Sequence, residues 1–205
     1  MIEGSASQFA SGRSFGSIAI DPKIEKALSH GAWVIFNLSG GKDCGAVSSR
    51  TMRYLDSVGH PRDRRFAIHA DLGRAEWEFT PAQVRKQAAA LGLRLDVVRA
   101  KSGDLVDRFE NRWRLGLNAY VDLRLYNLRG PWASPSLKFC QSEKKIQVMG
   151  PHLARELRGH TIINVVGIVF GPSLGFIFPC YFDLICVRRR AYDRTKLEVA
   201  ISIVV

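Results

Sequence analysis

The stretch that decides the fold reads Val34-Ile35-Phe36-Asn37-Leu38-Ser39-Gly40-Gly41-Lys42-Asp43-Cys44. Residues 33–38 form an almost wholly apolar run, as expected for a parallel strand covered on both faces. Two glycines then let the backbone turn sharply and approach a ligand closely. A helix is predicted to begin near Asp43, and the first turn of a helix presents N–H groups and a positive dipole end. With the Lys42 ammonium, this strand–loop–helix unit predicts a seat for a phosphate group.

Two segments resemble one known family. Ser39-Gly40-Gly41-Lys42-Asp43-Cys44 resembles the PP-loop of the ATP pyrophosphatases and of the phosphoadenosine phosphosulfate (PAPS) reductase-like proteins. The Gly-x-x-x-x-Gly-Lys-Ser/Thr spacing of kinase P-loops is absent. His69-Ala70-Asp71-Leu72-Gly73, followed by Glu76-Trp77, is similar to the second signature of the PAPS reductase-like proteins. The family usually has Ser or Thr at the position of Cys44, and a thiol is a weaker hydrogen-bond donor than a hydroxyl.

The rest of the chain predicts an alternating α/β fold. After the strand at 33–38, further strands are expected at 66–70, 93–98 and 160–168. Helices are expected to begin at Asp21, near Asp43 and at Thr80, the first with an Asp cap and a Pro in its first turn. This order predicts a parallel sheet with right-handed crossovers. The resemblance implies a Rossmann-like, three-layer α/β/α sandwich of the adenine nucleotide alpha-hydrolase-like group, with a parallel sheet of about five strands.

Two further segments lead to structural expectations. Residues 103–116 are predicted to be helical, with Leu105, Val106, Phe109 and Trp113 recurring at helical spacing. We interpret this stripe as part of the core rather than as a platform for stacking bases. Residues 62–65 are predicted to form a basic surface turn.

The predicted nucleotide site combines the loop with the ends of other strands. In a doubly wound sheet, ligands bind at the carboxyl ends of the strands, where His69, Asp71, Gly73 and Gly167 are expected. Taken singly, His69 also fits a hydrogen-bonded strand end and Asp71 a turn cap. The resemblance implies that nucleotide-binding residues are Ser39, Gly40, Gly41, Lys42, Asp43, Cys44, His69, Ala70, Asp71, Leu72, Gly73 and Gly167. It further implies that Lys42 and Asp43 act in catalysis, with Asp43 as a Mg²⁺ ligand or a helix cap.

A later segment adds a cysteine and three lysines. Cys140-Gln141-Ser142-Glu143-Lys144-Lys145 opens a helix and resembles the family's segment near the nucleotide or sulfur chemistry. Lys138, Lys144 and Lys145 are candidates for binding phosphate or sulfate, with a solvated basic face as the alternative. Cys140 is a candidate catalytic sulfur carrier or nucleophile, provided that cations stabilise its thiolate. The alternative for Cys140 is a small buried residue.

Composition sets broader limits on the function. The chain has 205 residues and a formal net charge of +11, which favours anionic ligands such as nucleotides, nucleic acid or acidic lipid surfaces. Its four cysteines show no Cys-x-x-Cys pair. This favours a reduced, cytoplasmic protein over a disulfide framework. No signal peptide is evident.

The domain prediction has three parts, of which the last is atypical. Residues 1–20 are expected to be a mobile lead-in, 21–168 the nucleotide-binding domain and 169–205 a separate tail. Residues 165–182 are uncharged and precede Arg188-Arg189-Arg190. The tail is therefore a divergent structured end, a membrane-spanning segment or the product of a shifted reading frame. We favour the shifted frame, because the change is abrupt, and Pro172 and Pro179 weaken the spanning interpretation.

Two hypotheses of function follow from the residues and the resemblance. The first is an enzyme that binds ATP or a PAPS-like adenylyl nucleotide, with Mg²⁺, and cleaves between the α- and β-phosphates or handles a sulfonucleotide. The resemblance implies tRNA or DNA as an acceptor, and membrane association is not expected. The Glu-Cys-Gly-Leu-His type motif of true sulfonucleotide reductases is absent, so PAPS reduction is not expected. The second hypothesis is a binding module for nucleotides or nucleic acid without catalysis.

Overall fold

The computed structural model describes residues 20–128, 130–134, 137–167, 184–185 and 199–204. Nearly all of the predicted lead-in therefore lies outside the described residues. Most of the tail also does, including Cys180, Cys186 and the three arginines at 188–190.

The fold is built on one mixed sheet of six strands in the order β3-β2-β1-β4-β6-β5. Four strands are parallel: β1 (Trp33–Asn37), β2 (Arg65–Asp71), β3 (Leu95–Arg99) and β4 (Ile162–Gly167). Strand β6 (Val199–Val204) pairs antiparallel with β4, and β5 (Leu184–Ile185) pairs antiparallel with β6. The prediction of about five parallel strands is therefore wrong in number. An apolar run predicts a strand but not its direction, and the run at the end of the tail returns antiparallel.

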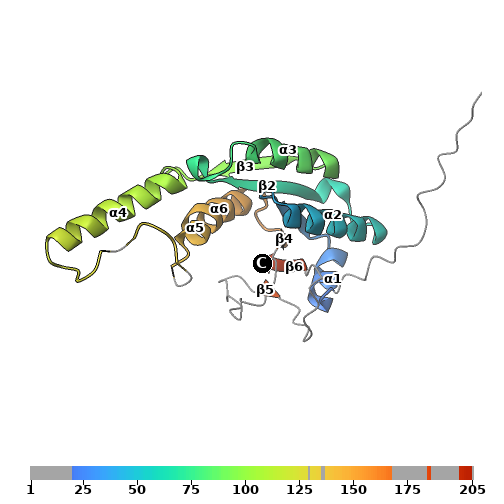
Figure 1. The fold of residues 1–205 in the computed structure, drawn as a ribbon. Helices are drawn as coiled ribbons and strands as arrows, with labels where there is room; N and C mark the ends of the chain where they lie inside the picture. The colour runs from blue at the N-terminus through green and yellow to red at the C-terminus, as the bar shows by residue number, and fades with distance from the viewer. Residues whose placement is uncertain (1–19, 129, 135–136, 168–183, 186–198, 205) are drawn as a thin grey trace, which may run out of the picture.

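Helices cover both faces of the parallel strands (Figure 1). On one face, α1 (Pro22–Ser29), α2 (Lys42–Ser57) and α3 (Thr80–Leu91) contribute to a core built around the buried Phe36. On the other face, α6 (Gln147–Glu156) packs its Leu153 against Ile35 and Ile68. Successive side chains of β1 point to opposite faces of the sheet, and those of the two faces belong to two separate hydrophobic cores. The architecture is a Rossmann-like α/β fold, as predicted.

The helix boundaries follow the expected local signals. The side chain of Asp21 accepts a hydrogen bond from the Lys23 N–H at 2.8 Å, and Pro22 opens α1. Thr80 and Pro81 begin α3, and Gly92 ends it with φ at +65°. A left-handed residue just after a helix favours glycine because a side chain there would be strained.

Helix α4 (Leu105–Val121) extends away from the rest of the fold, as Figure 1 shows. Leu105 is buried at its base and Phe109 is half-buried, but the side chain of Trp113 is 40% exposed. The prediction that this apolar stripe belongs to the core is therefore wrong beyond the first turns. A short connection returns from α4 to α5 (Phe139–Gln141), a π-helical turn η3 (Ser142–Ile146) and α6.

The predicted basic turn at 62–65 is also partly wrong. Residues Arg62–Arg64 form the 3-10 helix η1, but Arg65 begins β2 and is only 4% exposed. Its guanidinium donates to Asp56 Oδ1 at 2.6 Å and to His60 Nδ1 at 3.2 Å. A buried charge is stabilised only when it is paired in this way, and a sequence read one residue at a time does not reveal the partners.

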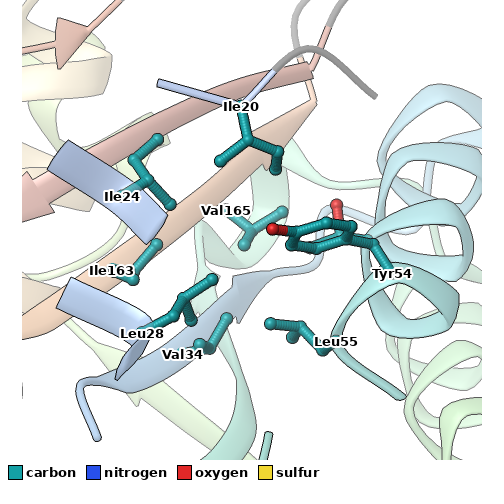
Figure 2. Close-up of a pocket in the computed structure, with 9 residues that line it drawn as sticks. Ile20, Ile24, Leu28, Val34, Tyr54, Leu55, Ile163 and Val165 are labelled. Atoms are coloured by element: carbon teal, nitrogen blue, oxygen red, sulfur yellow. The ribbon is translucent and has the colours of Figure 1, made fainter. Parts of the chain in front are cut away.

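Figure 2 shows a small pocket between α1, α2, β1 and β4. Its volume is about 10 Å³, enough for a single water molecule. The side chains around it are nearly all apolar, among them Ile24, Leu28, Tyr54 and Ile163. It is therefore a packing gap and not the nucleotide site.

One finding bears on the interpretation of the tail as a membrane span. Val165, Val166 and Gly167 belong to β4, inside the sheet. Among the described parts of the chain, no helix has the length and apolar character needed to cross a bilayer.

Candidate functional site

The candidate site lies where the carboxyl ends of the four parallel strands meet. The order β3-β2-β1-β4 means that the chain leaves β1 toward β2 on one side, while β4 occupies the other side. Such a reversal of strand order creates a crevice at the carboxyl ends. The loop from Ser39 to Gly41 follows β1 at this reversal. The described structure therefore places the predicted loop where an α/β sheet normally binds ligands.

The loop has the backbone geometry that the two glycines predicted. Gly40 has φ at +77°, and a Cβ there would lie 3.4 Å from Thr80 Cγ2, so the loop rests against the start of α3. Gly41 precedes the first turn of α2 in extended conformation, and no side chain caps this end of the helix. Ser39, Gly41 and Lys42 are exposed. An uncapped helix start with exposed residues around it can donate N–H groups to an anion.

The side chain of Cys44 contacts both ends of the loop from its buried side. Its side chain is buried, and its Sγ lies 3.3 Å from Ser39 Oγ and 3.4 Å from the Ser39 backbone nitrogen. The thiol is placed to donate to the Gly41 carbonyl oxygen at 3.1 Å. Gln87 of α3 also donates to that carbonyl at 3.0 Å. The Ser39 hydroxyl is therefore turned toward sulfur, within the loop.

Gly167 lets β4 approach the start of α2. A Cβ at Gly167 would lie 2.8 Å from Cys44 Cα and 2.9 Å from Cys44 N. Real Cβ contacts with backbone atoms are not that short, so only glycine fits without movement. The structure thus brings together Gly167 and the Ser39–Cys44 loop, which are far apart in the sequence.

The end of β2 supports the site through buried polar groups. The carbonyl oxygen of Leu38 can only accept, so His69 donates to it from Nδ1 at 2.8 Å, while its Nε2 lies 3.3 Å from Glu76 Oε2. Asp71 Oδ1 accepts from the Gly73 N–H at 2.7 Å, and its Oδ2 lies 3.7 Å from Arg99 Nε. In this geometry, His69 fixes the end of β1 and Asp71 caps a turn. The neighbouring Ala70 is buried, and Leu72 is half-buried.

An ion pair fixes the turn after β2 to the start of α4. Arg74 Nε donates to Asp104 Oδ2 at 2.8 Å, and the Asp104 carboxylate also accepts from two backbone N–H groups, those of Arg74 and Asp107. Because the guanidinium and these N–H groups stabilise the ionised form, the pKa of Asp104 lies well below its usual range. Gly73, with φ at +67°, is in contact with Asp104, so the loops after β2 and β3 are held together.

The segment with the later cysteine lies against the loop after β3. Lys144 is buried, and its Nζ donates to Ser102 Oγ at 3.1 Å and to the Gly103 carbonyl at 2.9 Å. As placed, this ammonium binds protein groups, and it does not lie on a solvated basic face. Cys140, Lys138 and Lys145 are half-buried, and Cys140 has a free thiol.

The contacts of Gln87, of Asn37 with Asn164 and of Trp77 with Phe79 at this edge were not predicted. Gln87 contacts the loop, and Asn37 Nδ2 donates to the Asn164 side chain and, at 3.1 Å, to the Val165 carbonyl. Trp77 and Phe79 are 75% and 66% exposed, and their rings are nearly parallel, with centroids 6.3 Å apart. Glu76, next to Trp77, contacts His69, and Thr80, next to Phe79, lies beside Gly40. Apolar residues between Glu76 and Thr80 in an otherwise polar turn were the available signal.

Near the loop, the described protein groups offer few ligands for a divalent metal ion. Within the described residues, no group of three or more His, Cys, Asp or Glu side chains could hold a metal ion. Asp43, half-buried in the first turn of α2, is the carboxylate nearest to the loop in sequence. Mg²⁺ is commonly held by one or two carboxylates together with substrate phosphates. Asp43 is therefore the carboxylate that could contact a Mg²⁺ ion bound to phosphates at the loop.

No protein-family model matches the chain, and no curated protein matches it.

Proposed function

We propose that this chain is an adenine-nucleotide-binding enzyme of the PAPS reductase-like type, which uses the Ser39–Cys44 loop to hold the phosphates of ATP. The observation that carries the proposal is the uncapped start of α2 behind the left-handed Gly40, at the strand-order reversal between β1 and β4. A helix start in that position binds phosphate with backbone N–H groups. The resemblance of residues 39–44 and 69–77 to the family points to the same edge of the sheet.

The reaction that fits is transfer of the adenylyl group. A nucleophile on the acceptor attacks the α-phosphorus, its bond to phosphorus forms, and the bond to the bridging oxygen breaks, so pyrophosphate leaves with the electron pair. Charge builds on the phosphoryl oxygens in this step. The N–H groups of the first turn of α2 and the exposed Lys42 ammonium would stabilise that charge. Handling of a PAPS-like sulfonucleotide at the same loop is the second activity that the resemblance supports.

The family resemblance and the position of the loop also suggest roles for the other site residues. Asp43 would hold Mg²⁺, which supplies charge neutralisation on the phosphates when bound. The backbone of residues 69–73 would contact the adenosine part, and the exposed Trp77 and Phe79 would supply an apolar wall beside it. Lys138 and Lys145 would add positive charge, and Cys140 would act on sulfur if sulfur is transferred. With a net charge of +11, tRNA or DNA is the acceptor class that we propose, in a cytoplasmic setting.

One observation favours a second function, that of a binding module without catalysis. The Ser39 hydroxyl and the Ser39 N–H both point toward Cys44 Sγ, which replaces the usual hydroxyl. A loop whose donors are directed at its own sulfur offers fewer groups to a phosphate. Such a loop can still bind a nucleotide weakly while failing to organise the reaction.

Calorimetry separates these functions. Purified protein is titrated with ATP, PAPS and the non-phosphorylated relative of PAPS, each with and without Mg²⁺. Binding that prefers ATP with Mg²⁺, together with pyrophosphate release in the presence of an acceptor, supports the enzyme. Binding of ATP without release of pyrophosphate from it, whichever tRNA or DNA acceptor is present, supports the module, and preference for PAPS supports the sulfonucleotide activity.

Matched variants test the loop itself. Lys42→Ala should weaken ATP binding at least tenfold, since it removes a cation from the proposed phosphate seat. Lys26→Ala, an exposed lysine on α1, should leave it unchanged. If Ser39→Ala and Lys42→Ala both keep the affinity of the unmodified chain, the loop is not the phosphate site under either function.

A further inference from the structure

The described residues between 105 and 138 (105–128, 130–134 and 137–138) form an arm that carries most of the exposed apolar side chains of the described chain. The arm consists of α4 and the connection that returns to α5, and Figure 1 shows α4 projecting from the fold. Of the fourteen large hydrophobic side chains that are exposed among the described residues, ten lie on this arm. A monomeric protein rarely concentrates apolar surface in this way.

The arm is an ordered unit with a fixed base. At the base, Phe109 packs edge to face with Trp132 at 5.2 Å and with the buried Phe139 at 5.7 Å between ring centroids. Arg108 donates to both carboxylate oxygens of Glu143, at 2.6 and 3.0 Å. Aromatic packing and a bidentate ion pair hold the two segments of the arm in one geometry. The exposed residues further out are thus presented on a defined surface.

The exposed side chains of α4 form a face suited to another helix. Trp113, Leu117 and Tyr120 follow the i, i+4, i+7 spacing of one helix stripe. Val121 continues this stripe, and Leu123 and Tyr126 extend the apolar surface into the connection, where both are almost fully exposed. The exposed parts of these six side chains together present on the order of 800 Å², since a large side chain covers about 150–250 Å². One partner in a standard interface contributes about 800 Å².

The charges of the arm argue against a nucleic-acid partner. Each described arginine of the arm already has an acceptor within the chain: Arg108 with Glu143, Arg112 with the Gly130 carbonyl, Arg114 with Asn111, and Arg124 with Asp122. Phosphate recognition depends on cations that can neutralise the backbone. An arm that carries ten exposed apolar side chains, and in which two of the four described arginines are paired with carboxylates, fits a protein partner better.

We propose that the arm docks onto the arm of a second copy of this chain. The apolar area is what one subunit of a stable dimer contributes, and a two-fold axis lets the same patch serve both subunits. Two arms that run antiparallel bring the base of one to the tip of the other.

Sedimentation equilibrium of the full chain over a concentration series tests this proposal. The unmodified chain should reach twice the 22.9 kDa chain mass by about 100 µM, with a dissociation constant on the order of 1–10 µM. The double variant Trp113→Glu, Tyr120→Glu should dimerise at least tenfold more weakly. A second variant, Tyr126→Glu, alters a fully exposed side chain that the fold does not need, and should also weaken the dimer.

The control places the same charge on exposed apolar residues elsewhere. Val58→Glu, Val97→Glu changes side chains that are 51% and 56% exposed, away from the arm, and should leave the dimer intact. A single-chain mass at every concentration overturns the proposal, as does equal weakening by the control. Binding of labelled RNA that requires Trp113 and Tyr120, in a chain that stays monomeric, would also overturn it in favour of a nucleic-acid surface.

Discussion

At the scale of single residues, Cys44 has the largest consequence for the proposed site. Its sulfur takes up the Ser39 hydroxyl and N–H and donates to Gly41. A serine would place a smaller and stronger donor at the same position. The loop could then turn more of its own donors outward.

Cys44→Ser should therefore raise the affinity for ATP. We expect a gain of about threefold to tenfold, or about 0.7–1.4 kcal/mol, the size of one improved hydrogen bond. Calorimetry with ATP and Mg²⁺ measures it, with Lys26→Ala on the exposed surface of α1 as the control. An unchanged affinity would show that the thiol does not limit phosphate binding.

Gly167 is the second residue with a specific prediction. Gly167→Ala forces a Cβ against the backbone of Cys44, which cannot move aside like a flexible side chain. We expect a loss of about 1–3 kcal/mol in the free energy of unfolding, as for overpacking, together with weaker ATP binding, because the loop must shift. Urea unfolding and calorimetry measure the two effects.

The control is a glycine with space around it. Apart from its chain neighbours, a Cβ at Gly150, inside α6, would meet nothing within 4 Å. Gly150→Ala should change the free energy of unfolding by less than about 1 kcal/mol, because the helix preference of alanine is offset by crowding of its Cβ against the ring of Pro151. If both variants behave alike, the close approach of β4 to α2 is not the cause.

At the scale of elements, the start of α4 is held by charge to η2 (Gly73–Ala75) and to η3. The Arg74 guanidinium lowers the pKa of Asp104, and the Arg108 guanidinium lowers the pKa of Glu143. A carboxyl whose pKa is lower in the folded state stabilises the fold above its unfolded pKa. That contribution is lost as the pH falls through the folded pKa.

Acid should therefore loosen these ion pairs. Between about pH 7 and pH 5 both carboxyls are ionised in the folded and unfolded states, since unfolded Asp and Glu titrate near pH 4. Below about pH 4 the free energy of unfolding should fall, and Asp104→Asn should flatten this decline while lowering stability at pH 7. Urea midpoints across the pH series measure both. A decline that is as steep in the variant would place the acid sensitivity in other groups.

The helix ends were easier to predict from the sequence than the surroundings of each helix. Asp21, Pro22, Thr80 and Gly92 mark helix ends through local backbone chemistry, and they predicted the helix boundaries well. The helical stripe of α4 was predicted as a helix but assigned to the wrong environment. Apolar spacing defines a face, whereas the partner of that face depends on where the chain leaves the sheet.

For the site, the sequence predicted positions better than contacts. The loop at 39–44, the end of β2 and Gly167 were expected at one edge, and the structure places them there. The partner of Lys144 was not predictable, because Ser102 and Gly103 lie some forty positions earlier and meet it only after folding. The exposure of Trp77 and Phe79 was not predicted, since exposure cannot be read from residue type.

At the scale of the whole molecule, the two edges of the parallel sheet differ. At one edge, β3 leaves Val97 56% exposed. At the other, β6 covers β4 from Ile162 to Gly167 in antiparallel register. An uncovered strand edge offers unpaired backbone groups to other chains. The last six described residues of the tail therefore protect the sheet, whatever the origin of the tail sequence.

Removal of the tail tests this role. A chain that ends at Gly167 should lose the β4–β6 hydrogen bonds, each worth about 0.5–1.5 kcal/mol. We expect a lower urea midpoint and concentration-dependent aggregation measured by light scattering. Ile201→Pro, which removes one N–H from β6 opposite Val165, should have a smaller effect in the same direction. If both chains unfold like the unmodified protein, the tail contributes nothing to the sheet.

A shifted reading frame would then be the better explanation of the tail sequence, and resequencing of the gene should show a polar continuation in another frame.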